Sequence, residues 1–180
     1  MPRLFVGLEL PDDIAFELEL MRGGVDGARW IDRDAFHLTL RFIGDVDGDV
    51  ADDIDDTLSD VDAEAFPLRL KGVGSFGGKA PRAIWAGVEP TPALHALQAD
   101  VERRLQRIGL APETRKFTPH VTLARMKHVS LSEVQAYLSN YNLYRSREFV
   151  VRDFILYSSR PSRGGGPYVA EERYQLAPDR

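Results

Sequence analysis

Two stretches of the chain alternate apolar and polar side chains and carry the same short motif. They are residues 36–43 and 117–125, and each holds His-x-Thr-Leu inside an apolar run. Alternation among β-branched and aromatic residues is typical of a β-strand with one buried face. Because side chains on a strand alternate between its two faces, each His should share a face with its Thr. The apolar neighbours then anchor the opposite face.

The rest of the pattern predicts helices and strands in an order that nearly repeats. Apolar residues at helical spacing favour an acidic helix at 48–63 and a longer helix that begins at Thr91-Pro92 and ends before Gly109. Ser130 or Ser132 is the expected cap of a short helix. The other expected helices span 11–21 and 130–140, and the other expected strands span 3–9, 66–73, 83–88, 149–157 and 168–176.

The two histidines lie 83 positions apart (120 − 37). This separation suits two copies of a half-domain better than one local motif. We therefore expect an α+β fold in which residues 1–180 form a single bilobal domain. Each of its two pseudo-twofold-related lobes should hold an antiparallel sheet with outer helices, and the site should lie in the cleft between the sheets.

The net charge of −5 hides an uneven distribution. Residues 45–64 hold ten acidic and no basic residues, so the remaining chain has 18 acidic (28 − 10) against 23 basic residues. A mildly basic body fits an anionic ligand. The acidic segment lacks the glycine position and spacing of an EF-hand loop, so we interpret it as a solvated helix face.

Several classes of protein are disfavoured by simple absences. The chain has no cysteine, so neither a disulfide framework nor a thiolate metal site is expected. Its start lacks a signal-peptide pattern, and no apolar run approaches the ~18 residues of a membrane span. We expect a monomeric cytoplasmic protein without a membrane contact.

Two imidazoles and two hydroxyls in one cleft would form a chemical site. Histidine has an unperturbed pKa of about 6.5, so one ring can accept a proton while the other donates one. Threonine hydroxyls can donate to anionic oxygens. The candidates are His37, Thr39, His120 and Thr122. A metal centre is not expected, because two such distant histidines lack a third ligand, and no serine lies in a nucleophile elbow.

These paired motifs resemble those of the two-histidine phosphoesterases. The closest likeness is to the RNA 2′,3′-cyclic phosphodiesterase branch, once named 2′-5′ RNA ligase. The resemblance covers nearly the whole chain, with supporting segments at 3–11, 81–85, 156–159 and 166–168.

The resemblance implies hydrolysis of a terminal 2′,3′-cyclic phosphate on RNA to a 2′-phosphate, with no metal and no cofactor. One histidine would take a proton from water, and the other would protonate the leaving 3′ oxygen. We favour His37 as the acid and His120 as the base. Thr39 and Thr122 would hold the non-bridging phosphate oxygens, and the partner would be an RNA end or a nucleotide.

Two arginines are candidate phosphate ligands. Strict alternation puts Arg41 on the face of His37 and Arg125 on the face opposite His120. The family's basic phosphate contact nevertheless corresponds to Arg125, five residues after the second histidine. A bulge near Ala124, or the end of the strand there, would reconcile the two. Arg41 is the weaker candidate.

Other residues receive ordinary structural interpretations. Phe5, Trp85 and Tyr168 could stack on a base, but packing is the expected role. His95 and His128 should lie on the surface. Two glycine-rich basic loops, 74–82 and 159–167, are expected to be flexible, and Lys79 or Arg82 of the first could reach an RNA phosphate.

Alternative functions stay open at this point. Ligation of 2′-5′ RNA would use the same residues in the reverse direction. Cleavage of 2′-5′ oligoadenylates or of a small cyclic nucleotide is also compatible with the motifs. A non-catalytic RNA- or nucleotide-binding module, or an interaction domain with accidental motifs, would differ from an enzyme only in turnover.

Overall fold

The computed structural model describes residues 3–159 and 168–178. In chain order its elements are β1 (Arg3–Glu9), α1 (Asp12–Leu20), β2 (Arg29–Trp30), the 3-10 helix η1 (Arg33–Ala35), β3 (His37–Asp45), α2 (Gly48–Ser59), β4 (Phe66–Leu68), β5 (Leu70–Phe76), β6 (Ala83–Val88), α3 (Pro92–Arg107), β7 (His120–Arg125), α4 (Leu131–Tyr141), β8 (Phe149–Val151), β9 (Asp153–Ser159) and β10 (Tyr168–Gln175). The α+β class is confirmed. Most of the predicted second glycine-rich loop, 160–167, lies outside the described residues.

The main sheet runs in the order β10-β9-β1-β3-β7-β6-β5, and β2 also pairs with β7. Its neighbouring strands are antiparallel. The two half-sheets meet where β3 pairs with β7, through Leu38 and Val121. The two His-x-Thr strands therefore lie edge to edge in one sheet, whereas the sequence suggested strands that face each other across a cleft.

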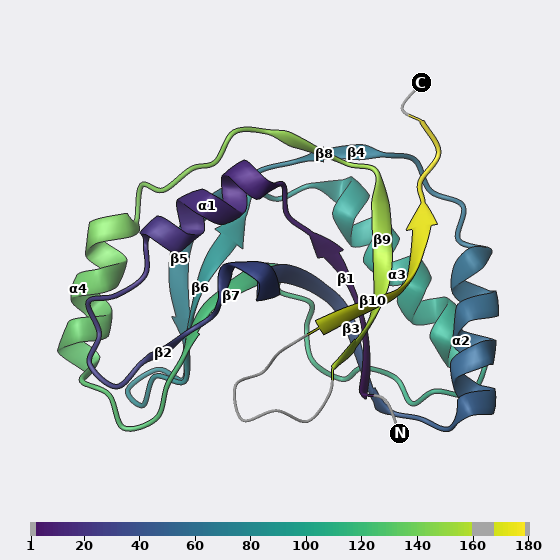
Figure 1. Cartoon of the computed structure of the whole chain (residues 1–180), viewed down its shortest axis with the longest axis horizontal. Coiled ribbons are helices and arrows are strands. Elements are labelled where there is room, and N and C mark those ends of the chain that lie inside the picture. The colour runs from purple at the N-terminus through teal and green to yellow at the C-terminus, as the bar shows by residue number, and fades with distance from the viewer. Residues whose placement is uncertain (1–2, 160–167, 179–180) are drawn as a thin grey trace.

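The helices divide between the two ends of this sheet. Figure 1 shows α1 and α4 beside β5, β6 and β7 at the left, and α2 and α3 beside β1, β3, β9 and β10 at the right. The apolar stripe predicted for α3 is buried at Leu94, Leu97, Val101 and Leu105. The acidic helix α2 buries Ile54 and Leu58 but ends at Ser59, before the predicted end. No helix in the described ranges is long and apolar enough to cross a membrane.

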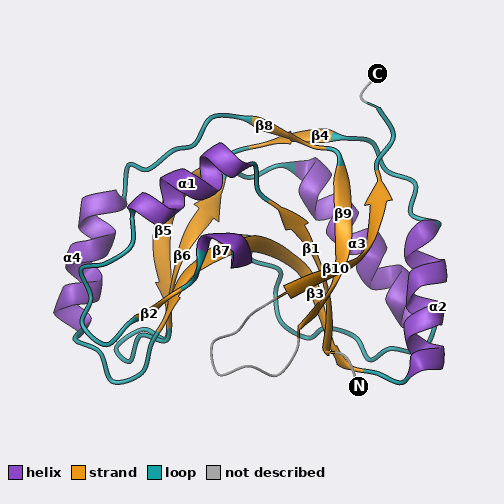
Figure 2. Ribbon diagram, in the orientation of Figure 1, coloured by secondary structure: helices purple, strands orange, loops and turns teal. Residues whose placement is uncertain are grey.

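Two predicted strands are each divided in the structure. The run at 66–73 forms β4 and β5, and the run at 149–157 forms β8 and β9. β4 and β8 pair with each other in a separate two-stranded sheet, at the top of Figure 2. β5 and β6, from the first half of the sequence, then lie beside β7, and β9 and β10, from the second half, lie beside β1. The two halves of the sequence thus exchange a pair of strands.

Candidate active site

The β3–β7 junction brings four of the predicted site residues together. Leu38 pairs with Val121 in an antiparallel register, and both side chains are buried in the core. In this register His37 lies opposite Thr122, and Thr39 lies opposite His120. The four side chains stand on the other face of the sheet, which the main core does not cover. A pseudo-twofold axis through this pair relates the two motifs.

A bulge interrupts each His-x-Thr strand just after its threonine. On β3, Gly7 pairs with Thr39 and Val6 with Arg41, so Leu40 is the extra residue. On β7, Trp85 pairs with Thr122 and Ile84 with Ala124, so the extra residue is Leu123. A one-residue bulge inverts the alternation of the residues that follow. Strict period-two counting therefore fails on both strands at equivalent positions.

The second bulge settles the placement of Arg125. This residue is now on the same face as Thr122, which agrees with the first of the two alternatives from the sequence, a bulge near Ala124. Burial lowers the pKa of both His37 and His120, and the positive charge of Arg125 lowers each pKa further. At the pseudo-equivalent position of β3, five residues after His37, stands Phe42, which pairs with Phe5 and is 45% exposed.

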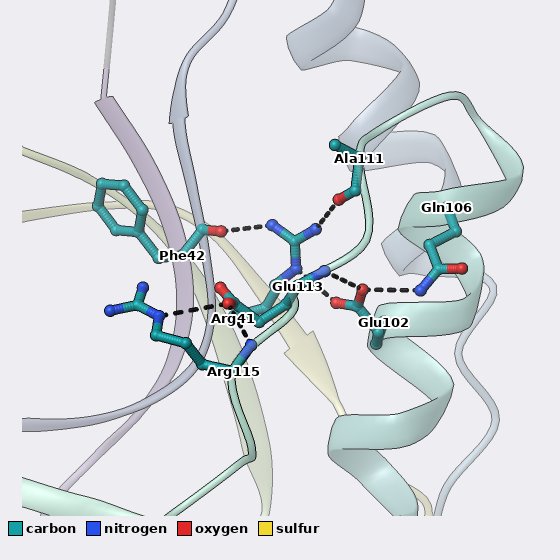
Figure 3. A network of polar contacts seen from close by, with 7 residues as sticks. All are labelled: Arg41, Phe42, Glu102, Gln106, Ala111, Glu113 and Arg115. Atoms are coloured by element: carbon teal, nitrogen blue, oxygen red, sulfur yellow. Dashed lines mark hydrogen bonds and ion pairs between the residues drawn. The ribbon is translucent and has the colours of Figure 1, made fainter.

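The first bulge turns Arg41 away from the histidines. Its side chain is only 7% exposed and donates hydrogen bonds to the Glu102 carboxylate and to the backbone carbonyls of Phe42 and Ala111. Figure 3 shows this network between β3, α3 and the segment that leads to β7. The structure therefore corrects the expectation that Arg41 contacts phosphate, and we leave Arg41 out of the proposed site.

Both imidazoles are held in the same way. The Nδ1 atom of His37 lies 2.8 Å from the carbonyl oxygen of Ala35, and Nδ1 of His120 lies 2.6 Å from that of Thr118. A carbonyl oxygen can only accept, so each ring carries a proton on Nδ1. This leaves Nε2 as the nitrogen available for proton transfer in both motifs.

Aromatic side chains wall each histidine. The ring centroid of His37 lies 4.8 Å from that of Phe5, 5.0 Å from Tyr168 and 6.0 Å from Tyr157. Phe5 and Tyr157 belong to a small apolar cluster separate from the main core. Phe5 and Tyr168 thus pack, as expected, but they pack against a catalytic candidate.

The wall around His120 comes from β5 and β6, which lie in the same half-sheet as β7. The His120 centroid lies 4.9 Å from Phe76 and 6.1 Å from Trp85. The Trp85 indole lies over Gly74, where a Cβ atom would come within 2.3 Å of the indole Cζ2. Sequence reasoning missed Phe76 and Tyr157 because both stand on the exchanged strands β5 and β9, far along the chain from the histidine each one contacts.

These surroundings lower the pKa of both imidazoles and so favour their neutral form. Burial, together with the smaller effects of the positive charges of Arg125 and His120, lowers the pKa of His37 to about 4, against the hydrogen bond to Ala35. Burial also lowers the pKa of His120, and Arg125 adds to this effect. A phosphate anion placed beside Arg125 would offset its charge and raise both pKa values.

The remaining histidines lie elsewhere. His95 on α3 is exposed and meets Phe117 at 5.3 Å between ring centroids, and His128 is exposed in a turn with φ of 55°. Across residues 3–159 and 168–178, no three side chains of His, Cys, Asp or Glu gather closely enough to hold a metal ion.

Two histidines with crosswise threonines, on the joined sheets of a two-lobed α+β fold, define the class of two-histidine phosphoesterases. The chain belongs to the 2′-5′ RNA ligase superfamily, whose family model matches residues 10–162.

Individual relatives agree with this membership. The chain is 30% identical over 182 residues to an RNA 2′,3′-cyclic phosphodiesterase of Aquifex aeolicus, an alignment that covers 97% of each protein. A protein of the same name from Aeropyrum pernix is 41% identical over 99 residues, and that match spans 54% of this chain and 56% of the relative. The crystal structure of Escherichia coli LigT in apo form has a TM-score of 0.80 at 25% identity and covers 98% of each chain.

Proposed function

We propose that this protein hydrolyses the terminal 2′,3′-cyclic phosphate of RNA to a 2′-phosphate by general acid–base catalysis between His37 and His120. The observation that carries the proposal is the pair of imidazoles, each fixed through Nδ1 and each opposite the threonine of the other motif. The names of the relatives from Aquifex aeolicus and Aeropyrum pernix support the choice of substrate.

The proposed reaction is an in-line displacement at phosphorus. Water attacks the phosphorus atom and gives its proton to Nε2 of one histidine. The bond between phosphorus and the 3′ oxygen breaks, and Nε2–H of the other histidine protonates that oxygen. Thr39, Thr122 and Arg125 hold the non-bridging oxygens as their negative charge shifts in the transition state. No protein group becomes covalently attached.

The two proton-transfer roles can be assigned in either direction. From the sequence we favour His37 as the acid, whereas its pKa of about 4 in the substrate-free protein favours it as the neutral base. For His37 to serve as the acid, the bound phosphate must raise its pKa above that of His120. We keep His37 as the acid and His120 as the base in the proposal, and a leaving-group experiment in the Discussion tests this assignment.

The lowered pKa values predict distinct pH profiles for the free protein and the complex. Catalysis needs one neutral and one protonated ring, so kcat/KM should peak between pH about 4 and 6.5 and fall at higher pH. The alkaline limb of kcat should lie at a higher pH, because bound phosphate favours the imidazolium. Values of kcat and kcat/KM, determined from initial rates between pH 4 and pH 9, test this expectation. An alkaline limb of kcat/KM above pH 6.5 would contradict it.

Folding stability must be controlled in this experiment. The unfolded chain binds protons at the histidines below pH 6.5, while the folded chain binds them only at lower pH. The free energy of unfolding therefore falls as the pH drops from 6.5 towards 4. Short assays after a jump from pH 7 separate this loss of stability from the titration of the site.

The proposed function is tested with an oligoribonucleotide that ends in a 2′,3′-cyclic phosphate. In EDTA, the wild-type protein should convert it to the 2′-phosphate, which chromatography distinguishes from the 3′-phosphate. No turnover would leave a binding module as the better interpretation, and loss of activity in EDTA would contradict a metal-free reaction. The same assay with a 5′-hydroxyl RNA added measures ligation. A monomeric state and a cytoplasmic location belong to the proposal and stay predictions.

A further inference from the structure

Charge breaks the pseudo-symmetry of the site. Beyond Thr122, β7 continues to Arg125 on the site face. The equivalent position beyond Thr39 on β3 is the apolar Phe42. β3 then ends at Asp45, whose carboxylate lies 3.9 Å from Nε of Arg3. The acidic helix α2 follows directly. The site face is therefore basic at the end of β7 and apolar at the equivalent position of β3.

A second arginine stands beside Arg125 on the basic end. In the short strand β2, Arg29 pairs with Arg125, and Trp30 pairs with Ala124. Trp30 points to the helix side of the sheet, because its ring lies 5.3 Å from that of Tyr137 on α4. Side chains alternate along a strand, so exposed Arg29 points to the site face, next to Arg125.

Two more cations lie at this end. The backbone amide of Met126 donates to the carbonyl of Arg82 at 3.0 Å, which places exposed Arg82 and the adjacent Lys127 beside the end of β7. Neither forms an ion pair with another residue in the described part of the chain.

We propose that Arg29 binds the phosphate that links the terminal nucleotide to the preceding one, so that the RNA chain leaves the site over β2 and the end of β7. Because Arg125 stands on the face of the two histidines, we assign it to the reacting phosphate. Neighbouring strands are about 4.8 Å apart, so a guanidinium one strand further out can reach a different phosphate. Its planar fork suits bidentate binding of phosphate oxygens. This inference rests on the proposed function and adds a preference for oligonucleotides over mononucleotides.

The test compares two substrates, adenosine 2′,3′-cyclic phosphate and a tetranucleotide that ends in the same group. The wild-type protein should have the higher kcat/KM for the tetranucleotide. Arg29→Gln should lower kcat/KM for the tetranucleotide about tenfold more than for the mononucleotide, the size expected for one charge-assisted hydrogen bond. Arg29→Lys keeps the positive charge but not the planar guanidinium. Its kcat/KM for the tetranucleotide should therefore lie between that of the wild-type protein and that of Arg29→Gln. Arg107→Gln, an exposed arginine at the end of α3, is the matched control and should leave the ratio unchanged.

Salt dependence gives a second readout that a purely structural role would not move. For the tetranucleotide, the slope of log kcat/KM against log salt concentration should become shallower by about 0.7 in Arg29→Gln, as for the loss of one phosphate contact by a single strand.

The outcomes separate this inference from the proposed function. The inference would be overturned, while the hydrolase stands, if Arg29→Gln lowered kcat/KM equally for both substrates and so left their ratio unchanged. A wild-type protein without a preference for the oligonucleotide would overturn it as well. Turnover of neither substrate by the wild-type protein would overturn both.

Discussion

Replacing His37 or His120 with alanine is expected to lower kcat/KM for an RNA with a 2′,3′-cyclic phosphate end by about 10²- to 10⁴-fold. This is the usual contribution of one positioned proton-transfer group. Each ring is held by a backbone carbonyl through Nδ1, which leaves its Nε2 for proton transfer. Loss should appear mainly in kcat, because Thr39, Thr122 and Arg125 would still bind the phosphate. Steady-state kinetics in EDTA measure both parameters.

The matched control for these variants is His95→Ala. His95 lies on the exposed side of α3 and should leave kcat/KM unchanged. Thermal unfolding of all three variants verifies that the fold is intact. A His37→Ala or His120→Ala variant that folds and keeps more than a tenth of the wild-type activity would rule out the two-histidine mechanism.

A substrate with a better leaving group assigns the acid and the base. In 3′-deoxyadenosine 2′-(p-nitrophenyl phosphate), the leaving p-nitrophenolate needs no proton, and the missing 3′ hydroxyl prevents spontaneous cyclisation. The variant without the general acid should regain most of the wild-type rate on this substrate, while the variant without the base should not. The proposed assignment predicts recovery for His37→Ala. Recovery for His120→Ala instead would reverse the roles, in agreement with the pKa order of the substrate-free protein.

Replacing Arg41 with methionine is expected to give the largest loss of stability. The guanidinium is 7% exposed, and the Glu102 side chain that it contacts is 15% exposed. Breaking such a pair leaves a buried charge uncompensated, which costs about 3–5 kcal/mol. Glu102 keeps hydrogen bonds from the Glu113 amide and from Gln106, at 2.9 Å and 2.8 Å, so we expect the lower end, about 3 kcal/mol. Urea unfolding measures the change.

Two further variants show whether burial is the cause. Arg103→Met breaks the more exposed ion pair with Asp100 and should cost less than about 1 kcal/mol. In the double variant Arg41→Met/Glu102→Leu, both charges are removed together, so part of the lost stability should return. A single Arg41→Met variant that is no less stable than Arg103→Met would contradict the assignment of Arg41 to the buried network.

Local patterns in the sequence were sufficient for most of the elements. The alternation at 36–43 and 117–125 correctly predicted the strands that hold the two His-x-Thr motifs, and the helical spacing of Leu94, Leu97, Val101 and Leu105 correctly predicted α3. The duplicated motif also pointed to two related lobes. These features depend on side chains within a few positions of each other, where period and turn chemistry are decisive.

The fate of the two arginines could not be read from the same pattern. Alternation placed Arg41 beside His37 and Arg125 away from His120, and the bulges at Leu40 and Leu123 reverse both placements. A bulge forms where the register of a strand against its partner slips by one residue. That partner, β1 or β6, is distant in sequence, so no local signal records the slip.

The sequence by itself thus determined which side chains can do chemistry and on which strands they stand. Only the tertiary structure decided how these strands meet, which arginine faces the site, and which aromatic residues desolvate each imidazole. The exchange of β5 and β9 supplies Phe76 to His120 and Tyr157 to His37. The physical reason is that burial and charge around a side chain come from contacts between segments far apart in the chain, which the pairing and register of whole strands select together.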